Sequence, residues 1–287
     1  MLSSLATVLF DGFAYGMLLF LLSVGLSVTL GMMNFVNLAH CSFAMVGGYA
    51  TVTLMNRFGW PFFATLPLAF LAGALISLVL ERALYRHLYR SSDLDQCLLT
   101  IGIVFVSVAA FAWFYTTEQQ SVPAPFPRDK PIAFMGLAFS QYRTFLIVFG
   151  LAVTAMLIFL LERTRFGAQV RAAVDNQRMA RGLGIDVDRA FMITFALGGG
   201  LAGLGGALAI EVVGLDPSFA LAYLVYVLIV VAVGGLGSIG GSFAAAVVLG
   251  ISDMAGKYYF PWLGAFVIYL VMVALLMWRP AGLFGKR

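Results

Sequence analysis

The chain has 287 residues, of which 62% are hydrophobic and only 10% are charged, and its mean hydropathy is +1.00. Soluble globular domains carry about 25% charged residues, so this composition excludes a protein whose whole surface faces water. The net charge of +4 does not indicate a nucleic-acid partner, because the arginines flank apolar runs, as the orientation of membrane proteins requires. We predict an all-α, polytopic membrane helical bundle in which residues 1–287 form a single transmembrane domain.

Apolar runs long enough to be membrane segments follow one another along the chain, since a full span needs about 20 mostly apolar residues. The first basic residue is Arg57, so the N-terminal run lacks the charged start of a cleaved signal peptide and is expected to be retained. We expect about eight or nine membrane segments, some of them broken or re-entrant, over the runs 5–30, 38–56, 61–80, 97–116, 144–161, 190–210, 220–233, 239–252 and 261–278.

The segment GMMNFVNLAH, Gly31 to His40, interrupts the first two runs with two asparagines and a histidine. In one interpretation Asn34 or Asn37 caps a helix that begins near Leu38, since Asn is a favoured N-cap, and His40 packs in the interior. In the other, these neutral groups line a path for a polar solute, and hydroxyls join them from Ser42, Ser238 and Ser242. The sequence leaves both interpretations open.

Two glycine-rich stretches punctuate the second half of the chain. GGLGSIGG, at 234–241, separates two short runs and is either a cytoplasmic turn or a break at membrane depth, which is tolerated only inside protein or beside a cavity. GGGLAGLGG places Gly199, Gly203 and Ala207 at helical spacing, and such small residues let membrane helices approach closely. It does not indicate a phosphate-binding loop, because no Lys-Ser/Thr follows it.

Basic residues predict the orientation in the membrane. The stretches 82–90, 163–189 and 279–287 hold three, six and three of the 17 lysines and arginines, and the expected spans place all three stretches on one side. The other side keeps five. Because basic residues accumulate on the cytoplasmic side, the N-terminus is expected outside and the C-terminus in the cytoplasm.

The acidic residues are expected in loops or at the ends of spans, with Asp253 in or near an outer loop and none at the bilayer centre. This argues against a transporter coupled to an ion gradient, which usually needs ionisable groups inside the membrane. It also argues against an enzyme. His40 and His87 are the only histidines, and no nucleophile set or metal cluster accompanies them, so we expect no catalytic residues, no metal site and no cofactor bound by this chain.

The longest outer loop, 117–143, contains VPAPFPRDKP, and its prolines forbid a continuous helix. The segment is expected to be extended. It is either a plain connector or a contact surface for an external partner.

The longest internal loop, 162–190, has a helical pattern from Ala168 to Arg181 that ends at two glycines. We predict one short amphipathic helix, with an apolar face made by Val170, Ala173, Val174 and Gln177. Its other face carries Arg171, Asp175 and Arg178. Such a helix lies on anionic lipid, connects two spans in water, or fits a groove in a soluble partner.

Five segments resemble signatures of one family, the permease subunits of branched-chain amino acid ABC transporters. RAAVDNQRMARGLGID is similar to the coupling-helix region of these subunits. The other four occur in family order over nearly the whole chain: GMMNFVNLAHCSFAMVGGY, ERALYRHLYRSS, VGGLGSIGGSFAAAVVLG and RPAGLFG. The resemblance is to the LivH-type subunit rather than to its larger LivM-type partner.

This resemblance implies a subunit of an importer in a bacterial inner membrane. The implied partners are a second permease subunit (LivM-like or an identical copy), two cytoplasmic ATP-binding subunits that hydrolyse ATP, and a periplasmic substrate-binding protein. The residues that the resemblance assigns to coupling with the ATPases are Arg171, Ala172, Ala173, Asp175, Arg178, Gly182 and Gly184.

The chain departs from the commonest family pattern at Ala39-His40-Cys41-Ser42, where many members follow Ala-His with Gly and an acidic residue. The missing carboxylate leaves the substrate open, since the family also transports urea, short amides and small organic acids. The alternative hypothesis is a passive channel for a small neutral solute, which predicts flux without nucleotide.

Overall fold

The structure is a computed structural model that describes residues 2–33, 35–89, 91–127, 131–134 and 137–285. Each of the nine apolar runs forms one helix: α1 (Leu2–Met33), α2 (His40–Phe58), α3 (Phe62–Leu80), α5 (Asp93–Tyr115), α6 (Gln141–Arg163), α9 (Val187–Val213), α10 (Phe219–Gly234), α11 (Ile239–Tyr259) and α12 (Gly264–Trp278). The connections hold the π-helical turn η1 (Glu81–Tyr85), α4 (Arg86–Leu88), α7 (Arg165–Asp175) and α8 (Gln177–Gly182).

Six helices are long and apolar enough to cross a membrane, namely α1, α3 with its extension to Leu88, α5, α6, α9 and α11. Helices α10 and α12 are equally apolar but shorter, at 16 and 15 residues. The all-α, polytopic prediction is therefore confirmed, and the number of membrane segments stays a prediction.

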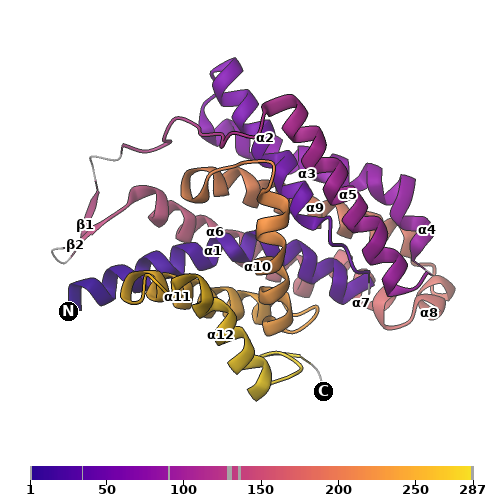
Figure 1. Ribbon diagram of the computed structural model, residues 1–287. Helices are drawn as coiled ribbons and strands as arrows, with labels where there is room; N and C mark the ends of the chain where they lie inside the picture. The colour runs from indigo at the N-terminus through magenta and orange to yellow at the C-terminus, as the bar shows by residue number, and fades with distance from the viewer. Residues whose placement is uncertain (1, 34, 90, 128–130, 135–136, 286–287) are drawn as a thin grey trace.

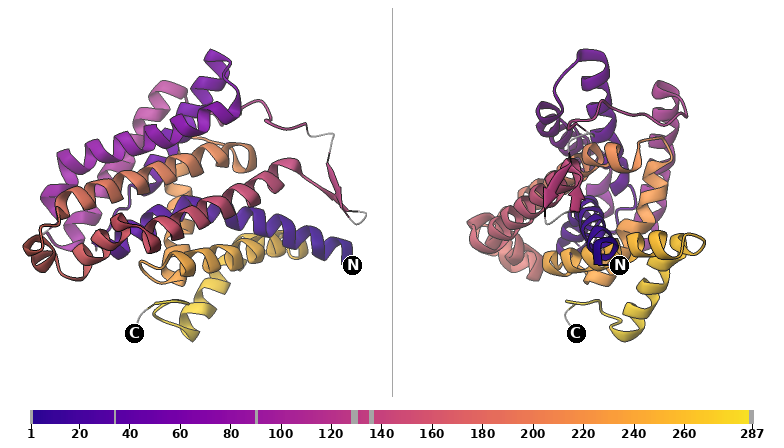
Figure 2. Two further views of the ribbon diagram at one scale, coloured as in Figure 1. Left: turned by 180° about the vertical axis from the view of Figure 1, so that it is seen from behind. Right: turned by 90° about the vertical axis from the view of Figure 1, so that its left-hand side faces the viewer.

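Between α5 and α6 the described residues form no helix, and the outer loop includes two short extended strands, as its prolines predict. It contains a small antiparallel hairpin, in which β1 (Ile132–Phe134) pairs with β2 (Leu137–Phe139). The backbone amide of Gln120 also donates to the carbonyl of Leu215, which ties the start of this loop to the segment between α9 and α10. The hairpin and the N-terminus lie at one end of the bundle, and α7 and α8 lie at the opposite end (Figures 1 and 2).

Helices α1 and α9 form the centre of the bundle. Helix α11 runs antiparallel along α1, while α2 and α3 pack on α9 (Figure 1). Helix α10 crosses the front of the bundle at a steep angle to α1. The turn from α10 to α11 lies against Gly31 near the end of α1. The amides of Leu283 and Phe284 in the C-terminal segment donate to the carbonyls of Val233 and Gly234 at the end of α10.

The glycines of α9 decide how closely these helices approach. Gly203 faces the backbone of α3, and Gly206 faces the backbone carbonyl of Ala44 in α2. On the other side Gly198 faces Gly25 of α1. A β-carbon at Gly199, Gly203 or Gly206 would collide with backbone or side-chain atoms of a neighbouring helix. Gly199 and Gly203 of the predicted small-residue stripe thus contact α3, and the neighbouring Gly198 and Gly206 make the close contacts with α1 and α2.

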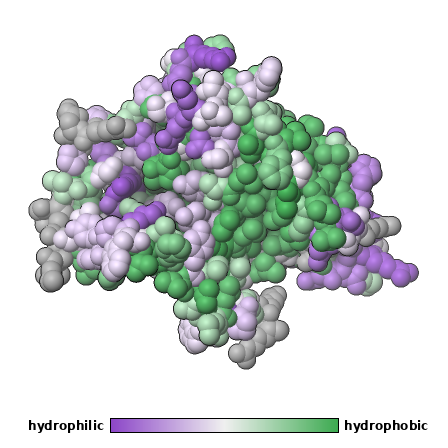
Figure 3. Space-filling model, viewed as in Figure 1, coloured by the Kyte–Doolittle hydropathy of each residue, from purple (hydrophilic) through white to green (hydrophobic). Residues whose placement is uncertain are grey.

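The outward faces of α3, α5, α6 and α12 are apolar and exposed. Figure 3 shows a broad hydrophobic area across the middle of one face, with hydrophilic residues gathered toward the ends of the bundle. Aromatic side chains mark the end that carries the N-terminus, where Trp60, Trp113, Tyr258 and Trp262 are exposed. Trp and Tyr concentrate at membrane–water interfaces, so this ring marks one boundary of the hydrocarbon.

Gly206→Ala is expected to loosen α2 from α9, because the added carbon overlaps the carbonyl oxygen of Ala44 on a rigid helix. Overpacking of this kind typically costs about 1–3 kcal/mol, so the unfolding temperature of the purified protein in detergent should fall. Gly102→Ala is the matched control, since a β-carbon there meets no atom within 4 Å. Equal unfolding temperatures for the two variants would contradict this packing.

Candidate translocation and coupling sites

The connection between α1 and α2 is a stretch of non-helical backbone that the side chains of α5 hold in place. The amide of Val36 donates to Oε1 of Gln96 at 3.0 Å, and the amide of Leu38 donates to Oγ1 of Thr100 at 3.2 Å. Unpaired amides are costly away from water, so these two α5 side chains supply the acceptors that a helix would otherwise provide. Asn34 lies outside the described residues.

This connection lies at membrane depth. Successive residues of the connection contact successive turns of α5. Val36 contacts Gln96, Leu38 contacts Thr100, and Ser42 bonds to Ser107 at 2.8 Å. Helix α5 has 23 residues and is therefore about 34 Å long, close to the thickness of the hydrocarbon layer. His40, where α2 begins, is level with the middle of α5. Helix α2 is thus a broken-helix element that starts inside the bilayer.

The polar side chains of the break are buried and only partly satisfied. Oδ1 of Asn37 accepts from the amide of Ala39, which is a local turn rather than a helix cap, since α2 begins at His40. The imidazole of His40 bonds to the carbonyl of Leu22 in α1. Nδ2 of Asn37 and Nε2 of His40 have no hydrogen-bond partner within the described residues. Two neutral polar atoms are therefore free to bond to water or a solute at mid-membrane.

The serines of the second predicted break lie elsewhere. Ser238 is the N-cap of α11 and accepts from the amide of Gly241 at 3.0 Å. Ser242 is fully buried, and its hydroxyl donates to that of Ser27 in α1 at 2.8 Å. Residues 235–238 form a tight turn with positive φ at Gly235 and Gly237. No hydrogen bond within the described residues joins these serines to Asn37, His40 or Ser42.

The predicted single helix at 168–181 is wrong, because the structure has two helices. Helix α7 ends at Asp175, and Asn176 takes an extended conformation in which its side chain caps α8 by accepting from the amide of Met179 at 3.0 Å. An Asn that bonds to the backbone two or three residues onward competes with a continuing helix. Gly184 has φ of 82° and follows α8, so the predicted stop is confirmed in position.

The predicted apolar face of this region is only half correct. Val170 and Ala173 are buried, and Ala173 packs with Ala180 of α8 against the first turns of α9. Val174 and Gln177 are exposed, and Gln177 belongs to α8, beyond the break at Asn176. Of the coupling residues, Ala172 is half-buried, and those exposed are Arg171, Asp175, Arg178, Gly182 and Gly184.

Exposed apolar side chains stand on α8 at the end of the bundle. Met179 is 64% exposed and Leu183, immediately after α8, is 78% exposed. They lie among Arg178 and Arg181, at the end of the molecule where hydrophilic residues gather. A guanidinium nitrogen of Arg171 donates to the carbonyl of Leu161, which ties α7 to the end of α6. The pair α7–α8 is therefore anchored to both α6 and α9.

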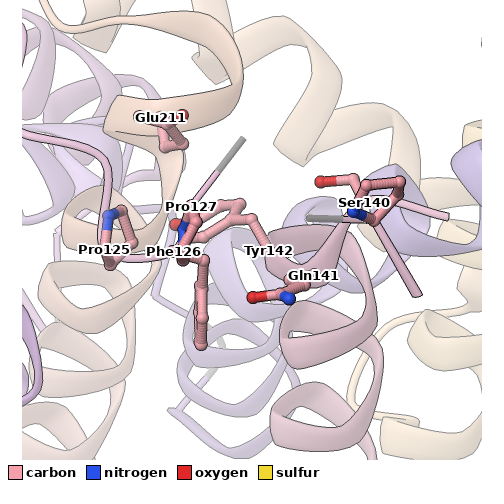
Figure 4. A pocket seen from close by; sticks show the side chains of 8 residues that line it. Pro125, Phe126, Pro127, Ser140, Gln141, Tyr142 and Glu211 are labelled. Carbon is pink, nitrogen blue, oxygen red and sulfur yellow. The ribbon is translucent and has the colours of Figure 1, made fainter. Parts of the chain in front are cut away.

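At the opposite end, a cavity of about 110 Å³ separates the proline-rich loop from α6 and α9. Figure 4 shows Phe126 and its flanking prolines on one side, with Tyr142 and Gln141 on the other and Glu211 above. The hydroxyl of Tyr142 donates to the carbonyl of Leu208 at 2.7 Å. The loop is thus folded back onto the bundle.

Asp253 was expected in or near an outer loop, and the structure places it in the last two turns of α11. It lies inside α11, its side chain is fully buried, and it accepts from the ammonium of Lys257 at 2.6 Å. The lysine one turn later neutralises it, which is why a carboxylate is tolerated there. Asp11 of α1 is likewise paired, with Arg143 of α6.

The family described as branched-chain amino acid transport system / permease component matches residues 8–276. This chain belongs to that family. It is 29% identical over 285 residues to the probable branched-chain amino acid transport permease protein LivH of Methanocaldococcus jannaschii, covering 94% of this chain and 90% of that protein. It is 24% identical to the high-affinity permease protein LivH of Escherichia coli K12, covering 97% and 94%. No solved structure matches the chain.

The larger permease protein LivM of Escherichia coli K12 is also related to this family member, at 26% identity over 298 residues, or 93% of this chain and 68% of LivM. The chain is thus a multi-pass membrane permease.

Sequence reasoning missed the α5 residues that hold the break. Gln96, Thr100 and Ser107 are spaced i, i+4 and i+11 and therefore share one face of a helix that is otherwise apolar. That spacing of polar residues on one face was the sequence feature that could have identified them.

Gln96→Leu is expected to free the segment 35–39, because the amide of Val36 then has no acceptor at membrane depth. Losing a buried hydrogen bond in this way costs about 1–3 kcal/mol, so amide hydrogen exchange in 35–39 should accelerate by about tenfold or more. Leu98→Ala, an exposed position on the same helix, is the control. Unchanged protection of 35–39 in Gln96→Leu would show that α5 does not hold the break.

Proposed function

We propose that this chain is one of two permease subunits of an ABC importer for branched-chain amino acids or a related small polar solute. The family match over residues 8–276 carries the proposal, and the relatives named LivH and LivM support a paired permease. In the proposal, residues 1–287 act as one permease domain in the inner membrane, with the N-terminus outside and the C-terminus in the cytoplasm. Two cytoplasmic ATPases drive it, and a periplasmic binding protein delivers the solute.

The pair α7–α8 is proposed to be the coupling element held by the ATPase. Met179 and Leu183 are apolar side chains exposed to water at this end of the bundle, which is unfavourable for the isolated chain. A groove in a partner would bury both. The neighbouring Arg178 and Arg181 add charge for an acidic rim. A push on α8 reaches α9 through the buried Ala180 contact and α6 through Arg171. The same displacement therefore acts on a central and a peripheral helix.

The α1–α2 break is proposed to line the solute pathway with neutral groups. Asn37 and His40 offer unpaired polar atoms at mid-membrane, and neither side chain carries a permanent charge. Such groups replace some of the hydrogen bonds that a polar solute loses on leaving water, without the tight hold of an ion pair. Because α5 is mostly exposed yet bonded to the break, movement of α5 against a second permease subunit would open or close this region.

The proline-rich outer loop is proposed to face the binding protein. It is folded back over α6 and α9, and it lies at the end opposite α8. A docked partner at this end and an ATPase at the other would act on the same two helices.

The proposal is tested by reconstituting the chain with its genomic neighbours in proteoliposomes. We expect the ATPase subunits to co-purify with this chain, and leucine uptake to require ATP and the binding protein. Equal flux without nucleotide would overturn the proposal and favour a passive channel. Accumulation driven by a proton or sodium gradient alone would also overturn it.

Met179→Ser combined with Leu183→Ser is expected to weaken binding of the ATPase subunits and reduce ATP-driven uptake by about tenfold or more, because the buried apolar area is lost. The unfolding temperature of the isolated chain should not change, since both side chains are exposed. His87→Ala, an exposed change outside α7 and α8, is the control and should keep normal uptake. Full co-purification and uptake in the double variant would contradict this docking surface.

A further inference from the structure

The buried ion pair of α11 is incompletely satisfied. Nζ of Lys257 donates to Oδ2 of Asp253, while Oδ1 of Asp253 is buried and has no hydrogen-bond partner within the described residues. The aspartate side chain is 0% exposed, whereas that of the lysine is 50% exposed. Lys257 therefore covers Asp253 from the accessible side, and its ammonium has further N–H donors to offer.

Tyrosines from two other helices, α1 and α10, lie near this pair, and a tyrosine of α12 lies beside one of them. The ring of Tyr15, on α1, lies 5.4 Å from Nζ of Lys257. Tyr223 and Tyr226, on α10, are close enough for the carboxylate charge of Asp253 to act on both. Tyr269 of α12 lies beside Tyr226, with ring centroids 6.3 Å apart. Aromatic faces attract ammonium groups, so both the tyrosine rings and the carboxylate of Asp253 favour a cation at this position.

The pair lies just inside the membrane boundary at the end that carries the N-terminus. Tyr258 and Tyr259, exposed members of the aromatic ring there, follow Asp253 by only five and six residues, or about 8 Å along α11. A buried ion pair of this kind is a poor device for stability alone, because apolar residues of similar volume often stabilise as well or better. Charged groups inside spans more often serve binding or transport.

We propose that Asp253 and Lys257 form a recognition site for the zwitterion of an α-amino acid, with Lys257 occupying the ammonium position when no solute is bound. An arriving amino acid would place its ammonium on Asp253, among the tyrosine rings, and its carboxylate on the displaced ammonium of Lys257. Two opposed ion pairs then replace one, and no net charge enters the membrane. This inference rests on the proposed function and names the solute class and its entry site.

A phosphatidylethanolamine headgroup offers the same pair of charges. The solute and the lipid are separated by reconstituting the complex in phosphatidylcholine and phosphatidylglycerol, which lack a primary ammonium, and by adding phosphatidylethanolamine in a second set of vesicles. Dependence on the solute alone supports the proposal. An effect that appears only with phosphatidylethanolamine overturns it in favour of a lipid site.

The decisive variants are Asp253→Asn, Lys257→Met and the double variant, measured by ATP-driven leucine uptake with saturating loaded binding protein. The double variant removes both charges at similar side-chain volume, so it should fold with a near-normal unfolding temperature. We expect all three to lose about tenfold or more of leucine uptake, because each removes a charged hydrogen-bond partner of the solute. If the ion pair were only structural, the double variant would recover the loss of the single variants, and the proposal would be overturned.

Two further measurements separate this site from the proposed function. Asp11→Asn combined with Arg143→Met removes a second ion pair that the described residues form at this end of the bundle, and it should leave uptake near normal. Leucine should also raise the unfolding temperature of the wild-type full-length chain, and isocaproate, which lacks the ammonium, should not. Loss of this shift in Asp253→Asn supports the site even if transport fails, whereas ATP-driven uptake without any such shift overturns the site alone.

Discussion

Close packing of α9 against α1, α2 and α3 is the constraint on which the bundle depends. Apolar surface gains nothing by leaving lipid for another helix, so association in the membrane relies on contact distance and polar bonds. The glycines of α9 reduce that distance to backbone against backbone, on α1 through Gly198 and on α2 through Gly206. The four helices therefore form a core that resists internal rearrangement. A displacement received at the start of α9 is carried by the core rather than absorbed within it.

Helix α5, unlike α9, is mostly exposed and is attached to the bundle by few contacts. Only 11% of its apolar window is buried. Gln96 and Thr100 accept hydrogen bonds from the α1–α2 break, and α2 is joined to α5 by hydroxyl contacts with Ser107 and Tyr115 and by the stacked ring of Phe111. These contacts fix the position of α5 along α2, but they are few. Helix α5 is therefore the spanning helix that the core restrains least. The non-helical backbone at 35–39 depends on it in turn, because those amides find their acceptors there. The rigid core and the loosely attached helix meet at the break.

The sequence predicted the parts of this fold that depend on apolar length, and it missed those that depend on single side chains. Nine apolar runs became nine helices, since in lipid a helix satisfies its own backbone. Asn176 ended a helix that its neighbours favoured, because its side chain capped the next one. The sequence placed Asp253 in or near an outer loop, but it did not predict that this side chain is buried and paired with Lys257 one helical turn later. The path of residues 35–39 needed tertiary partners on α5 and was open to two interpretations.

The two proposed solute sites differ in charge. The site near the membrane boundary is an ion pair, and the site at mid-membrane is neutral. At the entrance, Asp253 and Lys257 match both charges of an amino acid, which favours selection of a zwitterion over an anion, a cation or a neutral amide. At mid-membrane, Asn37 and His40 offer only neutral hydrogen-bonding groups, which compensate desolvation but hold the solute weakly. A charged pair at mid-membrane would bind more tightly and release more slowly, and it would need its own counter-ions when empty. Selection near water and neutral passage at depth would therefore allow discrimination without trapping, and in the proposed mechanism the solute is moved by the displacement of α9 and α6 from the opposite end.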